Sequence, residues 1–247
     1  MWLFEQEGFD NALRMSHVIV GIMWMGLLWF FNFVQVPAYA EMDAAARNNA
    51  LDKLTWRALW WFRWAAMATV VFGLLIIAVF PDLYDGDYWG STSGVTLLLG
   101  IIMGLTMAAN VWMVIWPNQQ IVIANARTVQ AGGEANPDAA AAGRRAAMAS
   151  RQNTIFSLPL LVFMVGASHF YNVSHWEQLD LSAGKWLVYF LIGVAIIAVL
   201  ELNALGRISG TGNGGLNVIY ETHKNAMYTG FALIVIFYLL AEIVLRA

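Results

Sequence analysis

Two histidines, His17 and His169, stand in long apolar segments where an uncharged imidazole could bind a metal ion. If both segments cross a membrane as helices, the two rings fall at a similar depth near one surface. Gly21 lies one turn after His17 and Gly166 lies three residues before His169, so a flat macrocycle could approach either backbone, with Trp24 as a wall. Neutral imidazole is a good axial ligand of haem iron. The pattern predicts a non-covalent b-type haem with His17 and His169 as metal ligands. The alternative is two interfacial histidines bonded to water or to a carbonyl group.

A set of amides and arginines, with one carboxylate and one histidine, falls near the opposite ends of the apolar segments. Arginine offers a bidentate fork to anions, and amides both donate and accept hydrogen bonds. We predict that a small planar anion binds among Arg151, Asn118, Gln119 and Asn153 and that His223 or Glu201 takes a proton. For any single member, solvation at the level of the lipid headgroups is the competing explanation. The full set is Asn32, Gln35, Arg63, Asn118, Gln119, Arg151, Asn153, Glu201, Asn203 and His223.

The composition indicates an integral membrane protein. Of the 247 residues, 60% are hydrophobic and 12% are charged, whereas soluble domains average roughly 45–50% and about 25%. Twelve tryptophans suit the aromatic belts at membrane surfaces. Cysteine is absent, which excludes disulfides, thiolate metal sites and a c-type haem attached through C-x-x-C-H. The net charge of −3 and the lack of a basic run argue against a nucleic-acid partner.

The apolar segments predict an all-α integral membrane bundle of about six transmembrane helices. A helix needs about 20 mostly apolar residues to cross roughly 30 Å of hydrocarbon. Pro37 is expected to close the first segment and Pro117 the third, because proline disfavours a helical residue before it. Residues 118–152 are expected to form a cytoplasmic helical hairpin within a single transmembrane domain, residues 1–247. The six segments lie at about 15–37, 61–80, 95–116, 154–171, 186–205 and 226–245.

Six spans place both termini on one side of the lipid bilayer, and the basic residues indicate which side. Loops on the opposite side hold ten of the thirteen Lys and Arg residues, while the side of the termini holds only Arg14, Lys185 and Arg246. Because basic loops stay in the cytoplasm, both termini are predicted to be periplasmic, in the inner membrane of a bacterium. His17 then lies toward the periplasm and Arg151 toward the cytoplasm.

Four stretches in order along the chain carry a family resemblance. They are "HVIVGIMWMGLLWFFNFVQVP" from His17, "ALWWFRWAAM" from Ala58, "IWPNQQ" from Ile115 and "SRQNTIFSLPLLVFMVGASHF" from Ser150. These stretches resemble the membrane-bound urate oxidase N-terminal domain family, whose members include urate hydroxylases that carry a C-terminal cytochrome c. The resemblance implies oxidation of urate to 5-hydroxyisourate, with electrons passed to a cytochrome c. A shorter likeness links the first stretch to the integral-membrane protoporphyrinogen oxidase family.

The sequence leaves the choice between an enzyme and an accessory protein open. The chain as given ends at Ala247 without a C-x-x-C-H stretch, so an enzyme of this kind is expected to use a separate cytochrome c. The main alternative is a non-catalytic haem-binding or structural subunit of a larger respiratory or photosynthetic membrane complex. A transporter of a purine-like anion is a weaker alternative, since no strong helix break or inverted repeat supports it.

Overall fold

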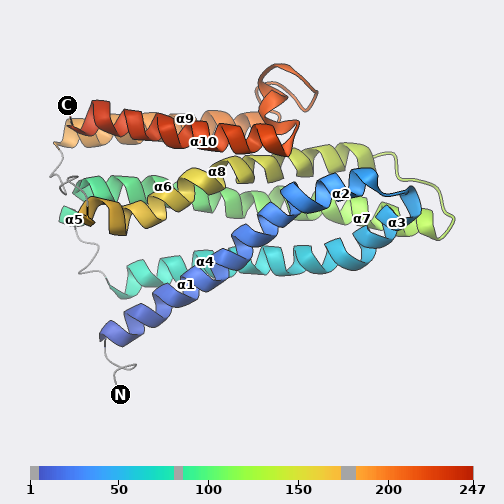
Figure 1. Ribbon diagram of the computed structural model, residues 1–247, viewed down its shortest axis with the longest axis horizontal. Coiled ribbons are helices and arrows are strands. Elements are labelled where there is room, and N and C mark those ends of the chain that lie inside the picture. The colour runs from blue at the N-terminus through green and yellow to red at the C-terminus, as the bar shows by residue number, and fades with distance from the viewer. Residues whose placement is uncertain (1–5, 81–85, 174–181, 247) are drawn as a thin grey trace.

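The fold is an antiparallel bundle of long helices (Figure 1). The computed structural model describes residues 6–80, 86–173 and 182–246, and their side chains except those of residues 6 and 168–173. The predicted all-α class is confirmed over these residues. The α-helices are α1 (Gln6–Trp29), α2 (Val36–Glu41), α3 (Ala44–Ala50), α4 (Trp56–Val79), α5 (Gly86–Gly90), α6 (Thr92–Ala109), α7 (Trp116–Gln130), α8 (Ala139–Val173), α9 (Ala183–Ala204) and α10 (His223–Ala241). Between or after them lie π-helical η2 (Phe30–Gln35), η3 (Leu51–Thr55), η5 (Asn110–Ile115) and η7 (Glu242–Arg246), and 3₁₀-helical η6 (Gly215–Tyr220).

Five helical stretches among the described residues are long and apolar enough to cross a membrane. They are Glu7–Glu41, Ala44–Val79, Thr92–Gln130, Ala183–Ala204 and His223–Arg246. They confirm five of the six predicted segments, and with them a multi-pass membrane protein. The remaining segment, predicted at 154–171, lies within α8, which is helical along that whole length.

The lipid-facing surface explains why so much of the chain is apolar. Large apolar side chains stay exposed on the outer helices, for example Ile22 and Ile243, each 68% exposed. In water such a surface would aggregate, whereas lipid tails solvate it at no cost. The exposed residues therefore support direct contact with the bilayer.

Two of the proline boundaries predicted from the sequence are wrong, because the helices continue through both prolines. A π-helical segment, η2 or η5, ends two residues before each of them. Ahead of Pro37, the N–H of Val36 bonds to the carbonyl of Phe31, five residues back, and the same pattern precedes Pro117. Proline lacks an N–H and its ring displaces the carbonyl four residues earlier. The wider π turn absorbs that defect, and each proline then stands in the first turn of the next α-helix.

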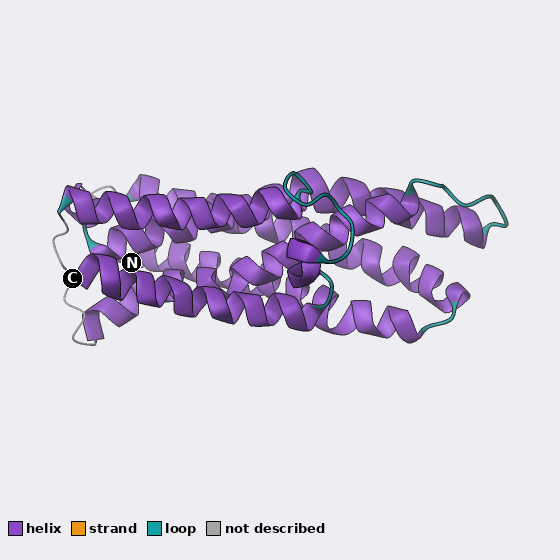
Figure 2. Cartoon of the chain, turned by 90° about the horizontal axis from the view of Figure 1, so that it is seen from above, coloured by secondary structure: helices purple, strands orange, loops and turns teal. Residues whose placement is uncertain are grey.

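The helices differ in length, and the longer ones project beyond α9 and α10 (Figures 1 and 2). The first three continuous stretches have 35, 36 and 39 residues, whereas those of α9 and α10 have 22 and 24. At 1.5 Å per residue, 36 residues extend about 54 Å, well over the roughly 30 Å of hydrocarbon. We call the surplus part, formed by α2, α3, η3, α7 and the start of α8, the projection.

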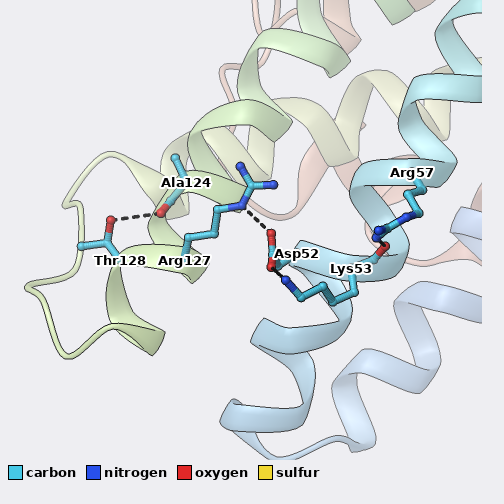
Figure 3. A network of polar contacts seen from close by, with 6 residues as sticks. All are labelled: Asp52, Lys53, Arg57, Ala124, Arg127 and Thr128. Carbon is cyan, nitrogen blue, oxygen red and sulfur yellow. Dashed lines mark hydrogen bonds and ion pairs between the residues drawn. The ribbon is translucent and has the colours of Figure 1, made fainter.

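An ion cluster ties the two arms of the projection together (Figure 3). Asp52 of η3 pairs with Arg127 of α7, and the ammonium of Lys53 lies 2.6 Å from the second oxygen of Asp52. The guanidinium of Arg127 also lies 5.1 Å from the ring centre of Trp56. Charge and a cation–π contact thus join the two arms of the projection, in addition to the apolar contacts that Ile123 and Met148 make in the core.

Helix α8 runs through the centre of the bundle. It packs against α6, α7, α9 and α10, and it crosses α1. Six consecutive residues from Gln152 to Ser157 are all fully buried, so no side of the helix faces lipid or water there. Four of the six are polar, namely Gln152, Asn153, Thr154 and Ser157. A polar helix segment buried on all sides needs internal hydrogen-bond partners, and these partners define the main candidate site.

Candidate functional site

The imidazole of His17 lies between α1 and α4. Its Nδ1 is 2.9 Å from the backbone carbonyl oxygen of Thr69. Because a carbonyl oxygen can only accept, Nδ1 carries the proton and donates it, and Nε2 keeps its lone pair. Metal-binding histidines commonly have this arrangement, with the second ring N–H held by a carbonyl group. His17 therefore has the tautomer that an axial haem ligand requires.

Gly73 makes room for that imidazole. A Cβ atom at Gly73 would lie 3.0 Å from Cε1 of His17, closer than ordinary contact. Gly73 lies four residues after Thr69, on the same face of α4, so one helix supplies both the hydrogen-bond acceptor and the space. Sequence reasoning missed both residues, although their spacing of four within a predicted span was a usable signal.

Two residues predicted beside His17 pack into the protein. Gly21 faces α4, where a Cβ atom would lie 3.9 Å from Cγ2 of Thr69, an ordinary contact distance. Trp24 is buried in the core, and its indole Nε1 has no hydrogen-bond partner among the described residues. A buried unpaired indole N–H is costly, so a bound acceptor at this position would stabilise the protein.

The second predicted ligand, His169, belongs to the helical part of α8, but its side chain lies outside the described residues. Gly166 is buried in the same helix. The end of α1 and the following η2 meet α8 at two hydrogen bonds, from Trp29 of α1 to Ser157 (3.0 Å) and from Asn32 of η2 to Ser150 (2.9 Å). From this crossing α1 and α8 diverge toward the end that carries the start of α1 (Figure 1).

A haem with two axial histidines needs fewer protein ligands than a metal ion that is held by protein side chains alone. The described residues include no group of three or more His, Asp or Glu side chains placed to hold a metal ion. A b-type haem supplies four nitrogens itself and needs only one or two protein ligands. His17 fits one of these positions by its tautomer.

The predicted anion-binding residues have different partners from one another. Arg151 donates a hydrogen bond to the backbone carbonyl of Tyr220, which ties α8 to η6. Burial lowers the pKa of the Arg151 guanidinium, and the charge of Arg144 lowers it further, whereas that of Glu221 raises it. Asn118 instead accepts from Nε of Arg145 at 3.0 Å. The described contacts thus connect Arg151 to η6 and Asn118 to another arginine.

The other two predicted residues lie on separate elements. Gln119 is partly exposed on α7. His223 begins α10, where the side chain of Thr222 caps the helix, and its ring centre lies 6.1 Å from that of Phe33. His223 therefore packs edge-on against an aromatic ring of η2.

A different group of polar residues forms two neighbouring hydrogen-bonded sets on and around α8, which we call together the α8 polar cluster: Asn110, Asn153 and Glu201 in one set, and Gln152 and Tyr220 in the other. The amide nitrogen of Asn110 lies 3.0 Å from Oδ1 of Asn153 and 2.9 Å from Oε2 of Glu201. Asn153 donates onward to the carbonyl of Met107 at 3.0 Å. The hydroxyl of Tyr220 lies 2.8 Å from Oε1 of Gln152.

The α8 polar cluster combines an ionisable group with unused hydrogen-bonding capacity. Gln152 and Asn153 are fully buried and Asn110 is 2% exposed. Nε2 of Gln152 has no partner among the described residues, although an unpaired buried amide costs about 1–3 kcal/mol. Ionisable residues inside a membrane bundle commonly serve ion, proton or substrate pathways. The cluster can therefore hold a proton at Glu201 and offer an amide donor to a small polar guest.

Asn153 and Glu201 were predicted from the sequence as polar site residues, whereas Asn110, Gln152 and Tyr220 were not. Asn110 was recognisable as a lone amide inside the apolar run of the third span, within "TMAANVWMV". Tyr220 gave no local signal, because its role depends on η6 folding back onto α8.

Comparisons with known proteins were made by family, by curated protein and by solved structure. The family described as urate oxidase N-terminal matches residues 86–203. Neither the curated proteins nor the solved structures gave a match. The matched range contains two of the four resembling stretches, those beginning at Ile115 and Ser150, whereas those beginning at His17 and Ala58 lie before it. The match supports the resemblance found in the sequence: residues 86–203, just under half of the chain, are similar to the urate oxidase N-terminal family.

Proposed function

We propose that the chain is a membrane oxidoreductase of the urate hydroxylase type, with its substrate side at the end of the bundle that carries the basic loops. One observation carries the proposal. The family match spans residues 86–203, and four of the five members of the α8 polar cluster fall inside that range: Asn110, Gln152, Asn153 and Glu201. The family thus coincides with a buried site that contains a proton acceptor.

The proposed reaction requires such an acceptor. Hydroxylation of urate adds the oxygen of a water molecule at C5, and two protons and two electrons leave as 5-hydroxyisourate forms. Glu201 takes one of these protons, and the amide of Asn110, 2.9 Å from Oε2, holds the carboxylate in place. Arg151, Asn118, Gln119 and His223 lie on the same end of the bundle and form the proposed approach for the urate anion.

The electrons need a separate path. His17 and His169 would hold a b-type haem, which accepts and passes electrons one at a time. The N–H of His17 bound to Thr69 supports this role. We further propose a bacterial inner-membrane location with periplasmic termini, and a separate periplasmic cytochrome c as the final acceptor.

The test uses the purified full-length chain under anaerobic conditions. Addition of urate should produce the absorption spectrum of reduced b-type haem, and His17→Ala should lower the haem content. Glu201→Gln should keep the haem but slow its reduction by about 100-fold, a typical effect of losing a general base.

Glu242→Gln is the matched control, because Glu242 pairs with Arg246 at the opposite end of the bundle. The haem of the Glu242→Gln variant should be reduced by urate at the wild-type rate. Haem that stays oxidised in wild type after urate addition would contradict urate as the electron donor and favour the accessory-subunit alternative.

A further inference from the structure

Arg63 of α4 is surrounded by indole rings. Its guanidinium carbon lies 3.9 Å from the ring centre of Trp116, 5.3 Å from that of Trp112 and 5.5 Å from that of Trp64. The indole Nε1 of Trp112 also donates to the backbone carbonyl of Arg63 at 3.1 Å. We call Trp64, Trp112 and Trp116 the tryptophan cage.

The guanidinium has no anionic partner within the described part of the chain. The ion pairs there involve Arg14, Lys53, Arg127 and Arg246, and Nε of Arg63 is buried without a hydrogen bond. Three indole faces attract the charge but leave the N–H donors unused. A partly buried arginine is stabilised most by a bidentate anion such as a phosphate, so the cage is half of a binding site.

The cage lies at the level where the bundle leaves the membrane. Asn110, two residues before Trp112, bonds to Glu201, which lies three residues before the end of α9. The polar connection that follows α9 must lie outside the hydrocarbon, because lipid tails cannot form hydrogen bonds with its backbone N–H and C=O groups. Tryptophan at this depth is typical of a membrane surface.

A lipid-sized apolar stripe leads from the cage along α4. Trp60, Trp64, Met67, Val71 and Leu74 follow one another at spacings of three and four residues, and all are between 37% and 53% exposed. They therefore share one outward face of the helix. From Arg63 to Leu74 the helix rises about 16 Å, close to the roughly 15 Å depth of one leaflet.

We propose that Arg63 and the tryptophan cage bind the phosphate of an anionic phospholipid in the leaflet at the basic-loop end. The headgroup phosphate accepts hydrogen bonds from the guanidinium of Arg63, and an acyl chain lies along the stripe on α4. The stripe distinguishes a lipid from free phosphate, which would gain nothing from the exposed apolar residues beside the cage.

The test measures binding of phosphatidylglycerol to the purified full-length chain in detergent, by native mass spectrometry and by the shift in unfolding temperature. Wild type should bind it about tenfold more tightly than Arg63→Gln, a difference of about 1.4 kcal/mol. Arg57→Ala is the matched control, because Arg57 is exposed on the same helix and its bond among the described residues is to the carbonyl of Lys53. It should bind like wild type.

Two further measurements distinguish a lipid site from other anion sites. Inorganic phosphate at the same concentration should not reproduce the stabilisation, and if it did, the site would be one for soluble anions. Arg63→Lys keeps the charge but loses the planar fork, so its affinity should fall between those of wild type and Arg63→Gln. Equal phosphatidylglycerol binding by wild type and either Arg63 variant would overturn the proposal.

Discussion

At the scale of single residues, the hydroxyl of Tyr220 is the point where η6 joins the α8 polar cluster. It lies 2.8 Å from Oε1 of Gln152 and 2.9 Å from the carbonyl of Leu200, and its one proton serves these two acceptors. Burial raises the pKa of the Tyr220 phenol well above its usual value, and the nearby charge of Glu201 raises it further, whereas the Asn203 side chain lowers it. The phenol therefore stays protonated at neutral pH and remains a donor.

Removing this hydroxyl should destabilise the fold. Tyr220→Phe leaves Oε1 of Gln152 buried without its donor, so we expect a loss of about 1–3 kcal/mol in the free energy of unfolding. The measurement is unfolding in mixed detergent micelles. Tyr228→Phe is the control, because Tyr228 is 63% exposed, and it should unfold like wild type. Equal stability of the two variants would show that the Tyr220 hydroxyl is dispensable.

The residue types of the candidate sites were predictable, but their partners were not. The sequence indicated that His17 could bind a metal, yet the carbonyl of Thr69 that fixes its tautomer is set by how α1 and α4 cross. Asn153 and Glu201 were recognised as polar residues near one membrane surface. Their connection through Asn110 depends on three helices meeting at one depth, which no local pattern encodes.

At the scale of elements, the contact of α10 with α8 depends on Gly230. A Cβ atom there would lie 2.9 Å from the backbone oxygen of Ile155 and 2.8 Å from Cδ1 of Leu158. Small residues allow such close approach between membrane helices, where packing replaces the hydrophobic effect as the main attraction. The buried polar segment of α8 is covered on this side only because α10 can come so near.

Gly230→Ala should therefore separate α10 from α8 and destabilise the bundle by about 1–3 kcal/mol, the usual cost of overpacking. Gly26→Ala is the matched control, since a Cβ atom at Gly26 meets nothing within 4 Å. That variant should be as stable as wild type or slightly more so. Both values come from detergent unfolding curves, and a stable Gly230→Ala variant would contradict the close-approach argument.

Helices were easier to predict than their ends. Apolar length alone located five membrane-crossing stretches, because hydrocarbon thickness imposes that length on any sequence. The helix ends predicted at Pro37 and Pro117 were wrong. A π turn before each proline allows the helix to continue past it when neighbouring helices pack against that segment. The projection was only partly predictable. The sequence of α7 has the pattern of a polar helix, whereas the sequence of α3 shows no strong helical periodicity of apolar residues.

At the scale of the whole molecule, the projection stands in water and depends on charge more than the core does. Asp52 is its main acidic contact, joining η3 to Arg127 of α7 (Figure 3). Asp52→Asn should loosen this contact and speed hydrogen exchange in α3 and η3, while exchange in α8 stays unchanged. Salt at about 0.5 M should produce the same effect in wild type, because it screens solvent-exposed pairs.

The control for Asp52→Asn is Asp138→Asn, which removes the same charge from an exposed position in the connection between α7 and α8. It should leave exchange in α3 at the wild-type rate. If both variants speed exchange equally, net charge rather than the specific pair holds the projection.

In the proposed reaction, the placement of Glu201 near the end of α9 would separate the route of the released protons from the route of the electrons. From Glu201 to the end of α9 is three residues, a rise of about 4.5 Å, whereas the fifteen residues from Asn32 back to His17 rise about 22 Å. Under the proposed function, protons released at the cluster would leave into the nearer compartment, while the electrons would travel by way of His17 toward the far one. Turnover would then carry net charge through the membrane, in the direction that an inside-negative voltage favours.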